Sequence, residues 1–169
     1  MQAGTTPVPG NTMFGNIFNI SGALGATENM IEKTYSVPLV SAEELSTMLQ
    51  KQKSIVLFDT RTPEEYEKSH IAGGLLLPPQ TPTDDFIKKY EALIREKTVV
   101  FYCSVGQRSS EFLNRVQKVC RQAGAKECYN LRGGIFGWYN QGHPVVNADG
   151  ETDDIHGYNA LWGMMIKKR

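Results

Sequence analysis

The stretch VVFYCSVGQRSS at residues 99–110 limits the possible folds of this chain more than any other. Four apolar or aromatic residues in a row are typical of a buried strand, and Cys103 follows them directly. A short loop of small and polar residues comes next, with Gly106 near its middle. Ser109 and Ser110 then stand where a helix N-cap is expected, and the apolar residues beyond them recur at helical spacing. The predicted order is therefore strand, cysteine loop, helix.

This order brings the thiol of Cys103 to the N-terminal end of a helix. The backbone N–H groups of such a loop turn toward one point, and the helix dipole adds positive potential there, so the loop can bind an anion. Arg108 adds a permanent positive charge, and these features together favour the thiolate form of a cysteine. We interpret Cys103 as a nucleophile that faces an anionic substrate. The alternative is a buried cysteine that only fills space at the end of a strand.

Strands alternate with helices through most of the remaining sequence. Strands are predicted over residues 35–40, 54–60, 75–77, 97–103 and 128–131. Helices are predicted over residues 41–50, 62–69, 83–95 and 109–122, with a short aromatic helix after Gly133 and Gly134. The alternation predicts an α/β fold with a parallel sheet that helices cover on both faces. Ligands of such sheets bind beyond the carboxyl ends of the strands, where Asp59, Cys103 and Arg132 are expected.

The two ends of the chain do not follow this pattern. Residues 1–33 are rich in Gly, Asn, Thr and Pro without a clean apolar period, which predicts a flexible N-terminal tail. The alternative is a segment that docks on the domain or on a partner through Phe14, Ile17, Phe18 and Ile20. The predicted domain spans residues 34–147, and residues 148–169 form a second tail. An apolar cluster in this second tail is expected to pack on its own domain or on a second copy, with a membrane surface as the weaker alternative; it comprises Leu161, Trp162, Met164, Met165 and Ile166.

Composition and charge argue against several classes of protein. The 169 residues include 18 Lys and Arg and 18 Asp and Glu, so that neither nucleic acid nor a strongly anionic surface is expected as a partner. The three cysteines lack the spacing of a metal site or of a disulfide framework, so no metal and no cofactor is expected. Neither a secretory signal nor an apolar run long enough to span a membrane is present in the sequence. The expected compartment is the cytoplasm, with an organelle as the alternative.

Three stretches, in this order, resemble the rhodanese (sulfurtransferase) family: LFDTRTPEEYEKSHIAGGLLLP, VVFYCSVGQRSS and NLRGGIFGWYNQGHPV. The resemblance covers residues 35–146 and implies a rhodanese-like domain with a central five-stranded parallel sheet in the strand order 1-5-4-2-3. It implies a sulfurtransferase that moves a sulfane sulfur from thiosulfate or a persulfide donor to cyanide or a thiol. The sulfur would be carried as a persulfide on the catalytic residue Cys103, with Arg108 as the second catalytic residue. The residues expected to bind the substrate are Ser104, Val105, Gly106, Gln107, Ser109 and Arg132, of which Arg132 has a turn contact as its alternative role.

Loop length distinguishes the activities that this resemblance leaves open. Phosphatases and arsenate reductases of the same fold carry a histidine before the cysteine and five residues between the cysteine and the arginine. Here Tyr102 precedes Cys103, and four residues separate Cys103 from Arg108. The tighter loop suits one sulfur atom better than a phosphate group, which favours a sulfurtransferase. A non-catalytic rhodanese-like interaction module, with the tails as docking segments, is a further alternative, against which the retained cysteine argues.

Structural roles are expected for other polar residues near the predicted site. Asp59 and Arg61 are expected to form an ion pair or a cap that orders the edge of the site. His70 is expected to close a helix before a glycine turn rather than to act as a base. Cys120 and Cys128 are expected in the core, with a resolving thiol for Cys103 as the alternative.

Overall fold

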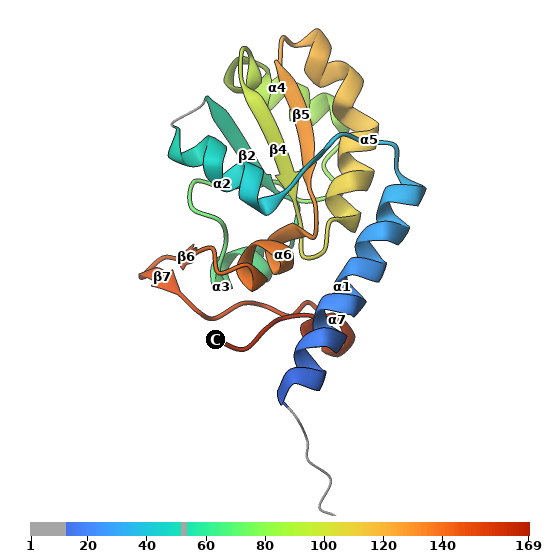
Figure 1. The fold of residues 1–169 in the computed structure, drawn as a ribbon. Coiled ribbons are helices and arrows are strands. Elements are labelled where there is room, and N and C mark those ends of the chain that lie inside the picture. Colours follow the sequence, from blue (N-terminus) through green and yellow to red (C-terminus); the bar gives the residue numbers. More distant parts are fainter. Residues whose placement is uncertain (1–12, 52–53) are drawn as a thin grey trace, which may run out of the picture.

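A five-stranded parallel sheet forms the centre of the molecule (Figure 1). The structure is a computed structural model, which describes residues 13–51 and 54–169. Within these ranges it describes all side chains except those of residues 13–19 and 21. The strand order is β1-β5-β4-β2-β3, and all four pairs of neighbouring strands are parallel. The strands are β1 Leu39–Val40, β2 Ile55–Asp59, β3 Leu75–Leu76, β4 Thr98–Tyr102 and β5 Glu127–Leu131. The predicted fold class and strand order are thereby confirmed.

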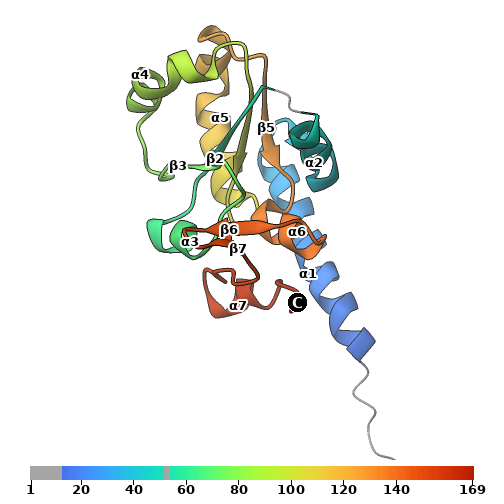
Figure 2. The ribbon, with the colours of Figure 1, turned by 90° about the vertical axis from the view of Figure 1, so that its left-hand side faces the viewer.

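Helices cover both faces of this sheet. They are α2 Ala42–Gln50, α3 Pro63–Lys68, α4 Thr83–Ile94, α5 Gln107–Gln122 and α6 Gly134–Asn140. The buried residues of α4 and α5 form one apolar cluster with one face of β2 and β4, whereas those of α2 and α6 pack against the other face. Figure 2 shows these two layers on opposite sides of the strands. The central strands are apolar on both faces because each face is covered.

Local sequence signals explain where several helices begin. Ser41 with Glu44, and Thr62 with Glu65, form capping boxes at the starts of α2 and α3, as the sequence pattern indicates. The start of α5 differs from the prediction. The helix begins at Gln107 rather than at Ser109, because Gly106 adopts a left-handed conformation (φ 102°) that turns the chain into the helix earlier.

The N-terminal segment is helical where a flexible tail was expected. Helix α1 spans Met13–Thr34, and its residues Leu24 and Ile31 are buried in the core cluster of α2 and α6. The helix differs from the irregular structure expected here because Leu24 and Ile31 gain more from packing than the composition of the segment indicates. The division into a domain and two tails stays a prediction. Residues 1–12 and the side chains of Phe14, Ile17 and Phe18, named in the docking alternative, lie outside the described residues.

The C-terminal segment also folds back on the domain. A hairpin of β6 Val145–Asn147 and β7 Gly150–Thr152 leads to the short helix α7 Ala160–Gly163. Trp162, Met165 and Ile166 pack against the core cluster of α2 and α6, whereas Leu161 and Met164 are exposed. None of the described helices is both long enough and apolar enough to cross a membrane.

Candidate functional site

The loop after β4 surrounds the sulfur of Cys103 with its own backbone. The N–H of Gly106 donates a hydrogen bond to the Cys103 Sγ over 3.2 Å. The first turn of α6 holds the other side of the loop, because the N–H groups of Ile135 and Phe136 donate to the carbonyl oxygens of Cys103 and Ser104 (2.8 and 3.0 Å). These two carbonyls therefore face α6, and the N–H of Gly106 is the loop donor that contacts the sulfur among the described residues. Cys103 has no exposed surface, and the predicted anion cradle with several inward-turned N–H groups stays a prediction.

A polar pair from α5 and β5 reaches the same sulfur. Ser109 Oγ lies 3.5 Å from the Cys103 Sγ and donates a hydrogen bond to Asn130 Oδ1 over 2.6 Å. A hydroxyl group has one proton to donate, and Ser109 donates it in the shorter contact, to Asn130. Its oxygen can then accept a hydrogen bond from the Cys103 thiol. Sequence reasoning named Ser109 but missed Asn130. The sequence feature that could have indicated Asn130 is its position, because it is a polar residue near the carboxyl end of β5, the strand next to β4.

Arg108 is bound to the carboxylate of Glu65, which also completes the capping box of α3. Its Nη1 and Nη2 donate to Glu65 Oε2 and Oε1, both over 2.8 Å, and Nη2 also donates to Ser104 Oγ. The hydroxyl of Ser104 in turn donates to Glu65 Oε1 over 2.9 Å. Glu65, which also accepts the N–H of Thr62, thus joins α3 to the cysteine loop.

Burial and charge act in opposite directions on this pair. Burial alone would raise the pKa of Glu65, but the hydrogen bonds and the charge of Arg108 outweigh it and lower the pKa to about 2. Burial alone would lower the pKa of Arg108, but its hydrogen bonds to Glu65 and the nearby charges of Cys103 and Glu65 raise it. Both groups are therefore charged at neutral pH. Arg108 Nε is buried and has no hydrogen-bond partner among the described residues, so this N–H is the donor still available to a ligand.

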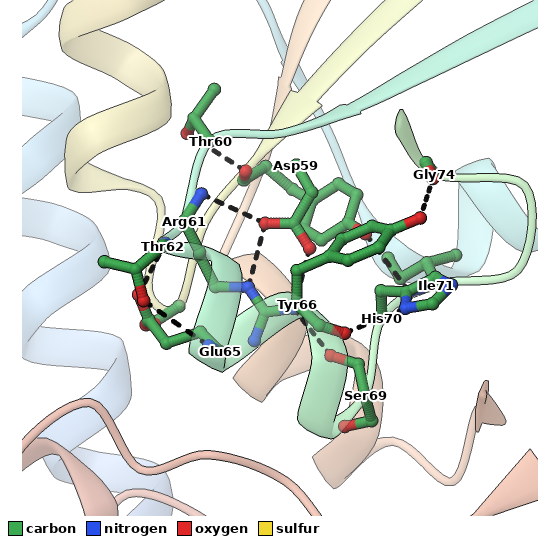
Figure 3. A network of polar contacts seen from close by, with 12 residues as sticks. Asp59, Thr60, Arg61, Thr62, Glu65, Tyr66, Ser69, His70, Ile71 and Gly74 are labelled. Atoms are coloured by element: carbon green, nitrogen blue, oxygen red, sulfur yellow. Dashed lines mark hydrogen bonds and ion pairs between the residues drawn. The ribbon is translucent and has the colours of Figure 1, made fainter. Parts of the chain in front are cut away.

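Asp59 and Arg61 form a second ion pair beside the loop, and both side chains are fully buried (Figure 3). Arg61 Nε and Nη2 donate to the two carboxylate oxygens of Asp59 over 2.9 and 2.7 Å, and Nη2 also donates to the carbonyl of Ser69. The ring of His70 stacks on Tyr66 with 3.9 Å between centroids, and its Nδ1 lies 2.9 Å from the Tyr66 carbonyl oxygen. These contacts join the end of β2 to α3 and to the turn that follows it, which is a positioning role.

The other candidate residues lie elsewhere. Arg132 pairs with two carboxylates of α1, with its Nε 2.8 Å from Glu32 and 3.4 Å from Glu28, and its role in substrate binding stays a prediction. Cys120 and Cys128 are buried in the core. Cys128 pairs with Val99 near the start of β4 and contacts the thiol of Cys120, whereas Cys103 follows the other end of that strand, so that neither core thiol is placed to resolve a disulfide with Cys103. In the described ranges, no three His, Cys, Asp or Glu side chains gather as a metal site.

A family model places this architecture among known proteins. Residues 41–141 match the model of the rhodanese-like domain. The chain belongs to the rhodanese-like family. The match includes β2, the cysteine loop and all of α6, which belong to the stretches that carried the resemblance in the sequence.

Relatives of this rhodanese-like chain carry sulfurtransferase names. It is 31% identical over 111 residues to a sulfurtransferase of Allochromatium vinosum, which corresponds to 66% of this chain and 96% of that protein. It is 33% identical over 108 residues to the probable adenylyltransferase/sulfurtransferase MoeZ of Mycobacterium tuberculosis, of which it spans a quarter (62% of this chain and 25% of that protein). A solved thiosulfate sulfurtransferase of Pseudomonas aeruginosa is similar with a TM-score of 0.56 at 21% identity (84% of this chain and 26% of that one), which shows the fold. The two relatives identified by sequence support a transferase role at the level of the family.

Proposed function

We propose that the protein is a sulfurtransferase that carries a sulfane sulfur as a persulfide on Cys103. The observation that supports this most directly is the hydrogen bond from the Gly106 N–H to the Cys103 Sγ within a loop of four residues between Cys103 and Arg108. A backbone donor of this kind stabilises negative charge on sulfur without a metal ion. The close fit of the loop suits one additional sulfur atom better than a tetrahedral phosphate.

The reaction divides into two sulfur transfers. In the first, the thiolate of Cys103 attacks the outer sulfur of thiosulfate or of a persulfide. A new S–S bond forms, and the S–S bond of the donor breaks, which releases sulfite or a thiolate and leaves a negative charge on the terminal sulfur of the Cys103 persulfide. In the second, cyanide or an acceptor thiolate attacks that terminal sulfur, and the electron pair of the broken S–S bond returns to Cys103 as a thiolate. No external oxidant or reductant is consumed.

The residues around the loop would act on charge and on geometry. The Gly106 N–H and the unpartnered Arg108 Nε–H are the donors that we assign to the transferred sulfur or to the leaving group. The Ser109 hydroxyl would accept a hydrogen bond from the thiol and so orient it, and the thiol proton would leave to solvent when Cys103 is activated. Glu65 would hold Arg108 and Ser104 in place and would not touch the substrate.

Intact mass spectrometry after incubation with thiosulfate tests this proposal. We expect the wild-type protein to gain the mass of one sulfur atom and to lose it again when cyanide is added. The Cys103→Ser variant should gain none, whereas the control variant Cys120→Ser should behave as the wild type does. Equal labelling of Cys103→Ser would refute the assignment of the nucleophile. A wild-type protein that gains no sulfur from thiosulfate, mercaptopyruvate or glutathione persulfide would favour the interaction module instead.

A further inference from the structure

The Cys103 thiol has no exposed surface, although the proposed function requires a donor to reach it. Most of its surroundings are fixed by several bonds. The first turn of α6 holds the loop through two backbone hydrogen bonds, and α1 is joined to Arg132 by two ion pairs and buries Leu24 and Ile31. Access therefore depends on a neighbouring part that is held less firmly.

Residues 155–164, which we call the C-terminal strap, are such a part. Within the described chain, the hydrogen bonds of the strap run between its own residues or to the two residues that follow it, and none joins it to the rest of the domain. Its flanks are anchored instead. The hydroxyl of Tyr139 donates to the carbonyl of Asp153, and the side chain of Asn140 binds the backbone of Met165 and Lys167. The strap thus has two fixed ends and a middle held mainly by side-chain packing.

Tyr158 connects the middle of the strap to the site. Its ring lies over the guanidinium group of Arg108, with 4.5 Å from the ring centroid to Cζ. Arg108 in turn donates to Ser104 Oγ, so that the layers run from Tyr158 through Arg108 to the cysteine loop. Figures 1 and 2 show α7, which belongs to the strap, at the same end of the molecule as α3 and α6.

The backbone at Tyr158 is itself strained. Its φ of 64° lies in the left-handed region, which a residue with a bulky side chain adopts at an energetic cost. The contact with Arg108 is therefore accompanied by an unfavourable backbone conformation at Tyr158. In addition, 43% of the Tyr158 surface remains exposed to solvent. A contact of this kind opens more readily than a packed helix, because releasing the ring also relieves the strain.

We propose that Tyr158 is a gate residue, whose ring closes the Arg108 side of the cysteine loop and whose release with the C-terminal strap admits the sulfur donor. The gate decides which donors reach Cys103, because a small donor needs a smaller opening than a persulfide on a large thiol or a protein. This inference deepens the proposed function and rests on it for the identity of the substrate. The gate itself is tested by a reaction that needs no sulfur transfer.

The test measures how fast Cys103 is alkylated by iodoacetamide and by a bulky maleimide, with the modified residue located by peptide mass mapping. Replacing Tyr158 by alanine removes the ring, and we expect alkylation of Cys103 to become roughly three- to tenfold faster, more so for the maleimide. Tyr158→Phe keeps a ring over Arg108 and should restore the wild-type rate. Leu161→Ala, on the same strap but 68% exposed, is the matched control and should leave the rate unchanged. Urea unfolding of each variant separates opening of the gate from loss of the fold.

Two outcomes would overturn the proposal. The first is an unchanged alkylation rate in Tyr158→Ala, and the second is an equal increase in Tyr158→Ala and Leu161→Ala. If the gate exists, Tyr158→Ala should also raise kcat/KM for glutathione persulfide more than for the smaller thiosulfate. If Tyr158→Ala is alkylated faster but the wild-type protein gains no sulfur from any donor, the proposed function is contradicted and the gate is still supported. The two failures are thereby distinguishable.

Discussion

Glu65 shows how one buried carboxylate can serve two structural purposes. Its Oε2 accepts the N–H of Thr62 and completes the capping box of α3, and both of its oxygens bind Arg108. The side chain is 1% exposed, so that removing its charge would leave the partly buried guanidinium group of Arg108 without its counterion. The position of the cysteine loop relative to α3 therefore depends on this carboxylate.

We predict that Glu65→Gln destabilises the protein in a pH-dependent way. The lowering of the Glu65 pKa from 4.5 to about 2 corresponds to roughly 3 kcal/mol, at about 1.4 kcal/mol per pKa unit. Because the folded-state pKa is lowered, this contribution is complete above about pH 4.5 and is lost as the pH falls toward 2. The unfolding free energies of wild type and variant, measured in urea, should therefore differ most above pH 5 and converge below pH 4.5.

Glu64 provides the control for this experiment. It is the neighbouring residue on α3, and its carboxylate is fully exposed. Hydrogen bonds to its own backbone and to Thr62 also lower the pKa of Glu64, but this exposed carboxylate pairs with no buried cation among the described residues, so Glu64→Gln should change the unfolding free energy much less than Glu65→Gln does at every pH. A gap between wild type and Glu65→Gln that stays constant from pH 7 to pH 3 would show that the charge of Glu65 does not carry the effect.

The second role of Glu65 could not be read from the sequence. The spacing of Thr62 and Glu65 predicts a capping box, because that contact is local. The partner Arg108 lies 43 residues away, and only the assembled sheet brings the start of α3 next to the start of α5. Asn130 was not predicted as a site residue for the same reason, since its contact with Ser109 joins β5 to α5. Local patterns predict the nucleophile and its loop, whereas partners that are distant in sequence require the fold.

At the scale of the element, α6 acts as a clamp on the cysteine loop. Gly134 has a φ of 57°, and a Cβ at this position would collide with the carbonyl oxygen of Cys103 and would lie 2.5 Å from that of Ser104. The close approach allows the N–H groups that follow to bind both carbonyls. The glycine pair in the sequence predicted a turn at this place, but not that the turn would hold the loop.

We predict that Gly134→Ala costs about 3 kcal/mol of stability and most of the proposed sulfurtransferase activity, because the loop must move away from the new Cβ. Gly142→Ala is the matched control, because Gly142 is also left-handed (φ 87°) but a Cβ there meets nothing within 4 Å. It should cost only about 1 kcal/mol and leave kcat unchanged. Urea unfolding and the thiosulfate assay check both variants. Equal losses in the two variants would mean that backbone strain, rather than the contact with the loop, accounts for the effect.

At the scale of the whole molecule, helix α1 and the C-terminal strap both pack on the domain. Helix α1 and the C-terminal strap lie outside residues 41–141, which match the family model, yet each contributes to the core cluster of α2 and α6. The sequence did not predict helix α1, because its first turn carries no acidic residue and its glycines weaken the helical pattern. Helix α1 forms because tertiary packing and the ion pairs with Arg132 stabilise it, which its local helix propensity alone does not. The division of the chain into one domain and two tails stays a prediction, but these ends no longer fit the description of free tails.

A pair of adjacent substitutions tests whether α1 is part of the folded domain. Ile31 is 4% exposed, and Ile31→Ala should lower the free energy of unfolding by about 2–4 kcal/mol. Met30, its neighbour, is 56% exposed, and Met30→Ala should change it by no more than about 0.5 kcal/mol. Alanine has the higher helix propensity, so that an undocked helix would be stabilised slightly by Ile31→Ala, and the sign of the change therefore decides the question. Urea denaturation with a single cooperative transition gives the measurement. If the two variants unfold alike, α1 does not contribute to the core, and the Glu28 and Glu32 contacts with Arg132 must then be too weak to hold it.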